Sequence, residues 1–369
     1  MKDEKKAPKL RFKGFTDDWE QCKLGDVAKI NSGKDYKGLQ PGKIPVYGTG
    51  GYMLSVNDKL SDIDAIGIGR KGTIDKPYYL NAPFWTVDTL FYVTPRGTVD
   101  ISFMFPLFKN INWKRYDEST GVPSLSKNTI KKIRVSFPQN NEQVKIGDLF
   151  QKITQIITLH EEKKRQLERL KSALLQKMFA DKSGYPAIRF EGFSDEWEQC
   201  KVKDIFKITR GKVLAATETS EEKSDISPFP VYSSQTKNNG LMGYYKDYLF
   251  DTAITWTTDG ANAGTVSYRS GRFYSTNVNG VLISDKGYAN KAISEILNLE
   301  AWKWVSHVGN PKLMNNVMGD ISIMIPSSFE EQDRLSDFLN QLDDTITLHN
   351  QKLNLLKLVK QSLLQNMFI

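Results

Sequence analysis

The sequence has few of the residues that build disulfide networks or metal sites. Of its 369 residues, two are cysteines, Cys22 and Cys200, and three are histidines. Two thiols can form neither a disulfide framework nor a four-ligand zinc site. We therefore expect neither a disulfide-stabilised secreted protein nor a metalloprotein, and we interpret both cysteines as buried, unreactive thiols.

Long apolar runs are also missing. No window approaches the roughly 20 consecutive apolar residues that a membrane-spanning helix requires. The first seven residues, MKDEKKA, have no apolar core that could serve as a signal peptide. Hydrophobic residues make up 39% of the chain and charged residues 25%, as in ordinary folded proteins. We expect a cytoplasmic protein of two or three globular domains that does not bind a membrane.

Basic residues exceed acidic ones, and the excess is uneven along the chain. Lysine and arginine number 51 against 43 aspartates and glutamates. Residues 1–180 hold 31 basic and 20 acidic side chains, whereas residues 181–369 hold 20 and 23. A basic protein favours a polyanionic partner. If that partner is nucleic acid, the first half supplies most of the attraction that is independent of base sequence.

The chain is two copies of one module. Residues 8–34 align without gaps to residues 186–212, and 16 of the 27 positions are identical. Further matches follow in the same order, including residues 121–138 with 309–326 and LLQKMF at 174–179 with LLQNMF at 363–368. Within each module the predicted secondary structure changes at a proline, which is Pro138 in the first module and Pro326 in the second. Short β-rich runs separated by turn residues precede it, and a long segment without proline follows.

The long segments have the 3.5-residue period of a coiled coil. One seam position comprises Ile146, Ile153, His160, Leu167 and Leu174. The other comprises Leu149, Ile156, Lys163, Leu170 and Lys177. The same positions recur 189 residues later, so we expect two long helices that pack antiparallel and bring His160 close to His349. Apolar residues such as Leu355 and Leu358 exceed what one seam uses, and they could cover the chain's own domains or a partner protein.

Several segments match catalytic motifs only in part. Residues 67–72 satisfy G-x-G-x-x-G, yet a strand and a turn follow where a dinucleotide-binding fold needs a helix. Residues 81–84, NAPF, are similar to a methyltransferase box, and we interpret them as a turn entering a strand. Residues 161–163, EEK, have nuclease-like spacing but lie in the middle of a helix. His160 and His349 could be bases or ligands, although a seam position favours a structural role.

The complete arrangement resembles a known family. Tandem globular domains that open with F-x-G-F-x-[DE]-x-W, each followed by a helix that closes with LLQxMF, are similar to the specificity subunit of type I restriction-modification enzymes. The resemblance covers essentially all of residues 8–369. It implies an α+β fold with target recognition domains at 8–140 and 181–328 and spacer helices at 141–180 and 329–369. The helices would pair as an antiparallel coiled coil with pseudo-twofold symmetry.

The resemblance also implies a division of labour. Each domain would read one half of a bipartite, asymmetric site in double-stranded DNA, and this chain would have no catalytic residues and bind no cofactor. Modification subunits, expected to be two, would carry S-adenosylmethionine and methylate adenine. Restriction subunits would use ATP and Mg to translocate and cut DNA.

Residues that suit DNA contacts gather in the loops of both modules. Arginine, lysine, asparagine, serine and threonine read base edges or bind phosphates, and aromatic side chains support them. The candidates of module one are Ser32, Lys34, Tyr36, Lys37, Arg70, Lys71, Lys114, Arg115, Tyr116, Ser124, Ser126 and Lys127. Those of module two are Arg210, Lys212, Thr258, Asn262, Arg269, Arg272, Lys312, Asn315 and Asn316. The aligned starts NSGK and TRGK are nearly alike and suit phosphate. Residues 67–77 and 112–120 differ from 255–269 and 300–308, so base reading is expected there.

Two other classes of protein compete with this interpretation. A fused methyltransferase-nuclease would need a cofactor motif and an acidic cluster, which the sequence does not supply. A two-domain adaptor for protein or glycan would bind DNA no more tightly than any protein of this charge.

Overall fold

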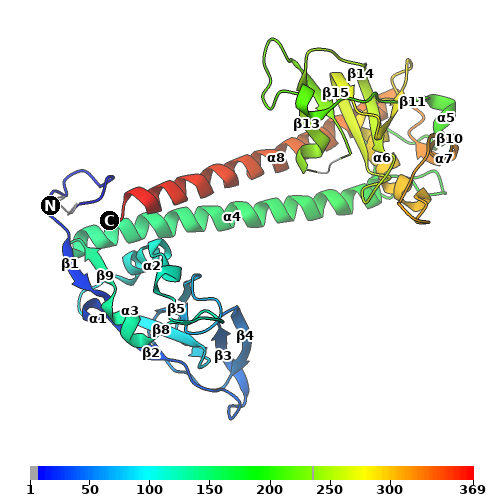
Figure 1. Cartoon of the computed structure of the whole chain (residues 1–369). Helices are drawn as coiled ribbons and strands as arrows, with labels where there is room; N and C mark the ends of the chain where they lie inside the picture. The colour runs from blue at the N-terminus through cyan, green and yellow to red at the C-terminus, as the bar shows by residue number, and fades with distance from the viewer. Residues whose placement is uncertain (1–6, 235–236) are drawn as a thin grey trace. The chain divides into compact units, whose positions relative to one another are not determined.

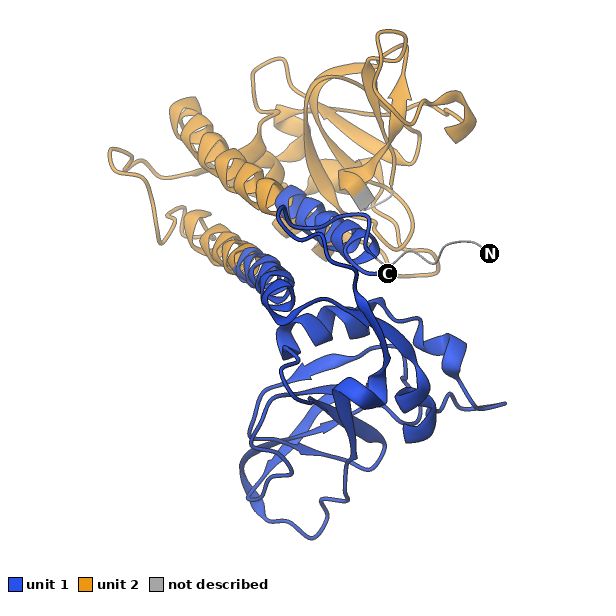
Figure 2. Cartoon of the chain, turned by 90° about the vertical axis from the view of Figure 1, so that its left-hand side faces the viewer, with its two compact units in different colours: residues 1–162, 350–369 blue, residues 163–349 orange. Residues whose placement is uncertain are grey.

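The chain forms two compact units. The computed structural model describes residues 7–234 and 237–369. Unit 1 consists of residues 1–162 and 350–369, and unit 2 of residues 163–349, as Figure 2 shows in two colours. Most of the amino-terminal heptapeptide considered above lies outside the described residues. Among the described helices, none combines the length and apolar character that crossing a membrane requires.

Unit 1 contains a mixed globular domain whose elements are labelled in Figure 1. Its strands are β1 (Glu20–Lys23), β2 (Ala28–Ser32), β3 (Pro41–Gly48), β4 (Gly51–Val56), β5 (Ala65–Gly69), β6 (Tyr78–Leu80), β7 (Trp85–Thr86), β8 (Leu90–Pro95) and β9 (Arg134–Phe137). Its short helices are α1 (Leu24–Val27), α2 (Ile101–Asn110), η1 (Trp113–Tyr116) and α3 (Lys127–Lys132).

Unit 2 repeats this order of elements. Its strands are β10 (Glu198–Lys201), β11 (Lys207–Arg210), β12 (Phe229–Tyr232), β13 (Leu241–Tyr245), β14 (Phe250–Thr257), β15 (Val266–Ser275), β16 (Asn279–Ile283) and β17 (Ser322–Ile325). Its short helices are α5 (Val202–Ile205), η2 (Ala216–Glu218), η3 (Lys237–Gly240), α6 (Lys291–Ala301), η4 (Trp302–Trp304) and α7 (Asn315–Asp320).

Two long helices follow the globular domains, α4 (Asn140–Met178) and α8 (Phe329–Asn366). In unit 1, Lys360 Nζ donates to Thr154 Oγ1 at 2.7 Å, and Lys357 forms an ion pair with Glu161 at 2.6 Å. Residue numbers thus rise along α4 as they fall along α8, so the helices run antiparallel. The predicted α+β architecture, with a long helix after each domain and antiparallel pairing, is confirmed. The expected approach of His160 to His349 stays a prediction.

The buried positions of α4 differ in one respect from the seam positions that the sequence predicts. Ile146 and Ile153 are buried as expected, but Ile156 and Leu170 are 43% and 49% exposed. Leu149, at the expected second position, is partly buried and packs against Ile153 and Ile157, while Phe150 and Ile157, each one residue after that position, are buried. The seam therefore follows i, i+4, i+7, which also turns the start of α4 toward its globular domain.

The corresponding sheets of the two units differ at one place. Unit 2 has a single six-stranded sheet in the order β11-β16-β14-β15-β12-β13, in which the long strand β15 pairs with both β14 and β12. Unit 1 has two sheets in its place, β2-β8-β5-β6 and β4-β3-β7, and each unit also has a two-stranded sheet, β1-β9 or β10-β17. Residues 81–84 divide the corresponding path into β6 and β7, and Pro83 has no N–H to continue the ladder. The NAPF segment is thus a turn entering a strand, as predicted.

The G-x-G-x-x-G segment also lies where the sequence placed it. Residues 67–69 belong to β5, which pairs with β6 and β8, and a turn follows them. No helix begins there, so this segment lacks the helix amino terminus on which a dinucleotide phosphate would rest.

A buried ion pair ties the start of each module to its long helix. In unit 1, Arg11 donates from Nε and Nη2 to the two carboxylate oxygens of Glu142 at 2.7 and 2.8 Å. In unit 2, Arg189 makes the same bidentate contact with Glu331, both bonds at 2.8 Å. The glutamates are 1% and 2% exposed. Hydrogen bonding to Glu142, the largest effect, raises the pKa of Arg11.

The end of the chain completes the core of unit 1. Met367 and Phe368 are buried there, and the Phe368 ring lies 6.3 Å from that of Trp19 and 5.5 Å from that of Phe103. In unit 2, Met178 and Phe179 occupy the equivalent place, and the Phe179 ring lies 6.4 Å from that of Trp197. The repeated LLQxMF motif therefore closes a hydrophobic core in each unit.

Neither cysteine is fully buried, which corrects the expectation in part. Cys22 and Cys200 lie on β1 and β10 with intermediate exposure. Burial, followed by the charges of nearby carboxylates, raises the pKa of each thiol to about 11. The thiols are thus protonated at neutral pH, in agreement with the predicted low reactivity.

We predict that Glu142→Ala destabilises the protein by about 3 kcal/mol, because it leaves the Arg11 guanidinium partly buried without its counter-ion. Urea unfolding measures the loss. Lys59→Ala removes an exposed ion pair with Asp62 and is the control, expected to cost less than about 1 kcal/mol. Equal effects of the two substitutions would contradict this role of Glu142.

We further predict that iodoacetamide modifies both cysteines roughly a hundredfold more slowly than free cysteine at pH 8, because few thiols with a pKa near 11 are ionised there. The rate should keep rising until the pH approaches 11. Mass spectrometry of each peptide measures it, and a rate that levels off near pH 9 would show that the thiols are unperturbed.

Candidate nucleic-acid interface

Backbone hydrogen bonds join several loops of unit 1 at one end of its larger sheet. The Gly72 N–H donates to Pro123 O at 2.8 Å, and the Leu125 N–H donates to Arg70 O at 2.9 Å. We call this place the loop junction of unit 1, and it comprises residues 32, 70–72, 91 and 123–127. Because the backbones are fixed to one another, the side chains form one surface although they come from distant parts of the sequence.

Half of the candidates from module one meet at this junction. A cavity of about 500 Å³ is lined by Ser32, Arg70, Lys71, Ser124, Ser126 and Lys127, together with Phe91 and Leu125. The Arg70 guanidinium carbon lies 5.9 Å from the centre of the Phe91 ring, and Lys127 Nζ lies 6.0 Å from it. Three positively charged side chains, Arg70, Lys71 and Lys127, thus line one cavity together with the Phe91 ring. Such side chains can attract phosphate and also contact base edges.

Acidic side chains hold the loop that carries the junction serines. The Asp117 carboxylate accepts hydrogen bonds from the N–H groups of Ser124 and Ser119 at 2.9 and 3.0 Å, and these bonds lower its pKa. Ser126 caps α3 by accepting from Thr129 N at 3.1 Å, and its hydroxyl donates to Glu118 at 3.1 Å. The loop is therefore ordered by its own side chains before any ligand binds.

The other candidates of module one lie outside the junction cavity. Tyr36 and Lys37 line a separate cavity of about 310 Å³ beside β3 and β4. Lys34 is exposed, and its N–H donates to Thr86 O at 2.8 Å. On η1, Lys114 forms an ion pair with Asp75 at 3.0 Å. Arg115 and Tyr116 follow on the same turn, the first exposed and the second packed against the core.

Unit 2 builds an equivalent junction with the same backbone bonds. The Gly260 N–H donates to Pro311 O at 2.9 Å, and the Leu313 N–H donates to Thr258 O at 2.8 Å. We call residues 210, 258–260, 280 and 311–316 the loop junction of unit 2. The Arg210 guanidinium donates from Nε to Asn315 at 3.4 Å within it.

The two junctions carry different side chains on the same backbone. Aligning the matched hydrogen bonds places Asp259 where unit 1 has Lys71, and Lys312 where unit 1 has Ser124. Asn315 likewise replaces Lys127. Unit 1 thus presents a strongly basic junction, whereas unit 2 presents one acid among basic and amide groups. Different hydrogen-bonding groups on one scaffold are what two readers of different base sequences require.

Two candidates of module two, Thr258 and Arg269, are buried. Thr258 is 0% exposed, and its hydroxyl is hydrogen-bonded to Val278 O and Asp259. Arg269 is 5% exposed and donates to Thr255 and Asn239 within its own domain. Burial lowers its pKa to about 10.

The remaining candidates of module two are more accessible. Lys212, Lys312 and Asn316 are exposed, and Asn262 is partly buried in the turn before β15. Arg272 lies on β15, where it pairs with Asp251 of the neighbouring strand β14 at 3.6 Å, and its guanidinium carbon lies 4.9 Å from the centre of the Tyr248 ring. Arg272 and Arg269 are thus held by their own domain.

The similarity of NSGK and TRGK has a structural cause. A side chain at Gly33 would meet Val87 O at 1.9 Å, and one at Gly211 would meet Ser275 O at 2.1 Å. Both glycines are therefore required by close backbone packing. The likeness of these segments does not by itself indicate a phosphate contact.

Sequence reasoning did not include one residue of the unit 2 junction among the candidates. Asp259 is acidic, whereas the candidates were basic, amide, hydroxyl and aromatic residues, although a carboxylate can accept a hydrogen bond from cytosine. Its alignment with Lys71 across the repeat was the signal that could have found it.

Comparison with known proteins gives a consistent result. The model of the type I restriction modification DNA specificity domain matches residues 16–169 and 194–358. A putative type I specificity subunit of Mycoplasma pneumoniae is 32% identical over 229 residues, which are 61% of this chain and 81% of the relative. A second such protein of the same organism is 33% identical over 213 residues, 57% of this chain and 81% of its own length.

Solved structures share the fold at low sequence identity. The S subunit of a type I restriction-modification system from M. genitalium aligns with a TM-score of 0.76 and 16% identity, covering 98% of this chain and 99% of that one. A structure described as showing complex assembly and conformational transition of a type I system aligns with a TM-score of 0.51 and 12% identity, covering 94% and 96%.

We predict that Arg70→Ala raises the Kd for duplex DNA roughly tenfold if the junction of unit 1 contacts DNA. A phosphate contact would weaken all sequences equally and reduce the salt dependence by about one ion, whereas a base contact would relax one position. Fluorescence anisotropy at several salt concentrations measures both. Lys164→Ala on α4, which removes an equal charge from a helix, is the control, and equal losses would show that only net charge matters.

Proposed function

The chain belongs to the type I restriction-modification DNA specificity family and is a DNA sequence-recognition subunit of such a system; on this premise we propose that each globular domain reads one half of a bipartite, asymmetric site. The proposed recognition domains comprise residues 8–140 and 181–328, and helices at 141–180 and 329–369 act as spacers.

The observation that carries this proposal is the pair of loop junctions. Both are built by the same backbone hydrogen bonds, between residues 70–72 and 123–125 in unit 1 and between 258–260 and 311–313 in unit 2. Their side chains differ in charge and in hydrogen-bonding groups. A shared scaffold positions each surface, and the differing side chains give each half-site its own sequence.

The residues proposed to contact DNA are the accessible ones at or near these junctions. In unit 1 they are Ser32, Arg70, Lys71, Ser124, Ser126 and Lys127, with Lys114 and Arg115 beside them. In unit 2 they are Arg210, Asp259, Lys312, Asn315 and Asn316. The greater positive charge of the first set supports a larger phosphate contribution from unit 1.

We propose that methylation and cleavage reside on partner subunits. Modification subunits, expected to be two, would hold S-adenosylmethionine, and restriction subunits would use ATP and Mg. Exposed apolar side chains on the long helices support protein partners, since Leu159, Leu355 and Leu358 are each more than 60% exposed. These residues are the part of the apolar surplus that the chain's own domains leave uncovered.

We predict that exchanging residues 31–137 for the same segment of a relative changes one half of the methylated site and leaves the other half intact. The reason is that each junction rests on the core of its own unit. Single-molecule sequencing of methylated adenines in cells with each version measures the outcome. If both halves change together, recognition is shared between the domains and the two-reader proposal fails.

A further inference from the structure

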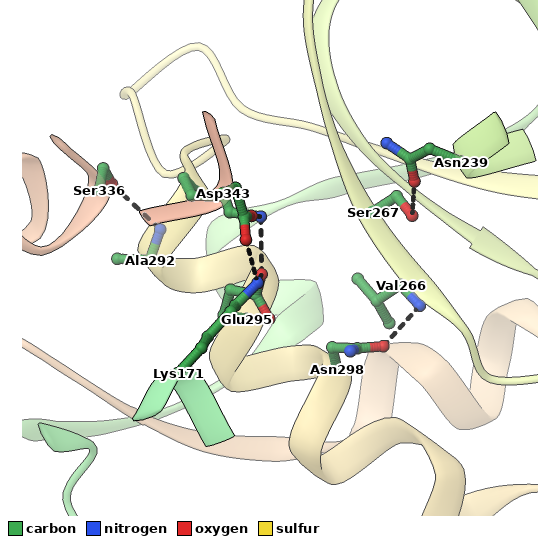
Figure 3. Close-up of polar contacts among 10 residues, drawn as sticks. Lys171, Asn239, Val266, Ser267, Ala292, Glu295, Asn298, Ser336 and Asp343 are labelled. Atoms are coloured by element: carbon green, nitrogen blue, oxygen red, sulfur yellow. Dashed lines mark hydrogen bonds and ion pairs between the residues drawn. The ribbon is translucent and has the colours of Figure 1, made fainter. Parts of the chain in front are cut away.

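Four charged side chains form a closed ion-pair network in unit 2, beside α4, α6 and α8. Lys171 contacts Glu295 at 3.0 Å and Asp343 at 2.7 Å. Lys291 contacts the same two carboxylates at 2.6 and 2.7 Å. Figure 3 shows Lys171 pointing toward both acids. Two cations and two anions balance, so this site needs no external counter-ion.

The repeat places the same lysine, but not the acids, in unit 1. The helices α4 and α8 are related by an offset of 189, which pairs Glu142 with Glu331 in equivalent ion pairs. By this offset Lys360 corresponds to Lys171, and Thr154 corresponds to Asp343. The helix α2, which takes the place of α6, contains no acidic residue. Lys360 Nζ donates instead to the neutral Thr154 hydroxyl at 2.7 Å.

A cavity of about 530 Å³ opens at this position in unit 1. Lys360 and Lys109 share its wall with the apolar side chains of Phe105, Phe150 and Leu364. Among the ion pairs of the described residues, none includes either lysine. Burial lowers the pKa of both lysines, and the positive charge of Lys360 lowers that of Lys109 further.

One carboxylate does line the cavity, but other groups already bind it. Asp64 accepts a hydrogen bond from the Tyr79 hydroxyl at 2.8 Å and from the Ala82 N–H at 2.9 Å. Within residues 7–234 and 237–369, no carboxylate therefore forms an ion pair with either lysine.

We propose that this cavity binds an aspartate or glutamate side chain of a modification subunit, an inference that rests on the proposed function. Unit 2 itself shows that carboxylates fit beside the equivalent lysine. The apolar wall suits the methylene groups of a protein side chain better than a free inorganic ion. Gln155 on the cavity wall is followed one turn later by Leu159, which is 68% exposed and extends the surface available to a protein.

The proposal makes the two units unequal in partner binding. The site in unit 2 is occupied by the chain's own acids, so a partner carboxylate gains contacts only in unit 1. Two identical modification subunits would therefore bind with different affinities.

Thr154→Asp tests this by placing the carboxylate of unit 2 beside Lys360. We expect a higher unfolding temperature for the chain alone, and roughly tenfold weaker binding in one of the steps by which purified modification subunits associate. Thr154→Asn has the same size without the charge, and it should stay within about twofold of wild type. Isothermal titration of the full-length chain measures the affinities.

Three other outcomes would contradict this inference, and they differ in whether the proposed function fails as well. If wild type binds modification subunits and the Asp and Asn variants bind equally well, this inference is overturned while the proposed function stands. If wild type binds no modification subunit, the partner assignment itself fails, and this inference fails with it. The double substitution Asp3→Asn with Glu4→Gln can be made in wild type and in Thr154→Asp. If it lowers the unfolding temperature of the first protein but not of the second, the chain's own first residues supply the carboxylate, and the inference is overturned.

Discussion

The buried pair between an arginine and the first-turn glutamate of the following long helix holds each unit together. Arg11 and Glu142, or Arg189 and Glu331, join the start of a module to its helix across more than 130 residues of sequence. Because both oxygens of each glutamate are engaged, the contact fixes direction as well as distance. The recognition loops lie between these two anchored points. The loops can therefore change in sequence while the frame that presents them stays the same.

Much of this frame could be predicted because it repeats. Buried Trp19 and Trp197 and the strands β1 and β10, which pair with β9 and β17, belong to the residues that match best between the modules. The error in the second seam position has a physical reason. A heptad pattern alone assumes that a helix packs on another helix, whereas Phe150 packs on the core of a globular domain. The division of one sheet into two by residues 81–84 depended on a local difference in sequence, because Pro83 lies in this segment whereas the equivalent residues 270–273 of unit 2 contain no proline.

The candidate interface was predictable only in part. Ser32 and Arg70 are brought together by strand pairing, because β2 and β5 both lie beside β8, and the bond from the Leu125 N–H to Arg70 O adds the loop that leads to Lys127. Chemistry alone could not reveal that Thr258 turns inward at the end of β14, since one residue along a strand changes the face on which a side chain lies. The charge contrast between Lys71 and Asp259 became visible only when the hydrogen bonds aligned the two junctions.

Residues 367 and 368 complete the core of unit 1, and this has a consequence for folding during translation. Met367 and Phe368 pack beside Trp19, yet a ribosome adds them after all of unit 2. Until then, the first domain has a hydrophobic gap beside Phe103 and Phe150. The second domain has its own helix end, Met178, before its strands are synthesised. The domain that is translated first is thus the one whose packing is finished last, and a nascent chain must keep that gap shielded from other apolar surfaces while translation continues.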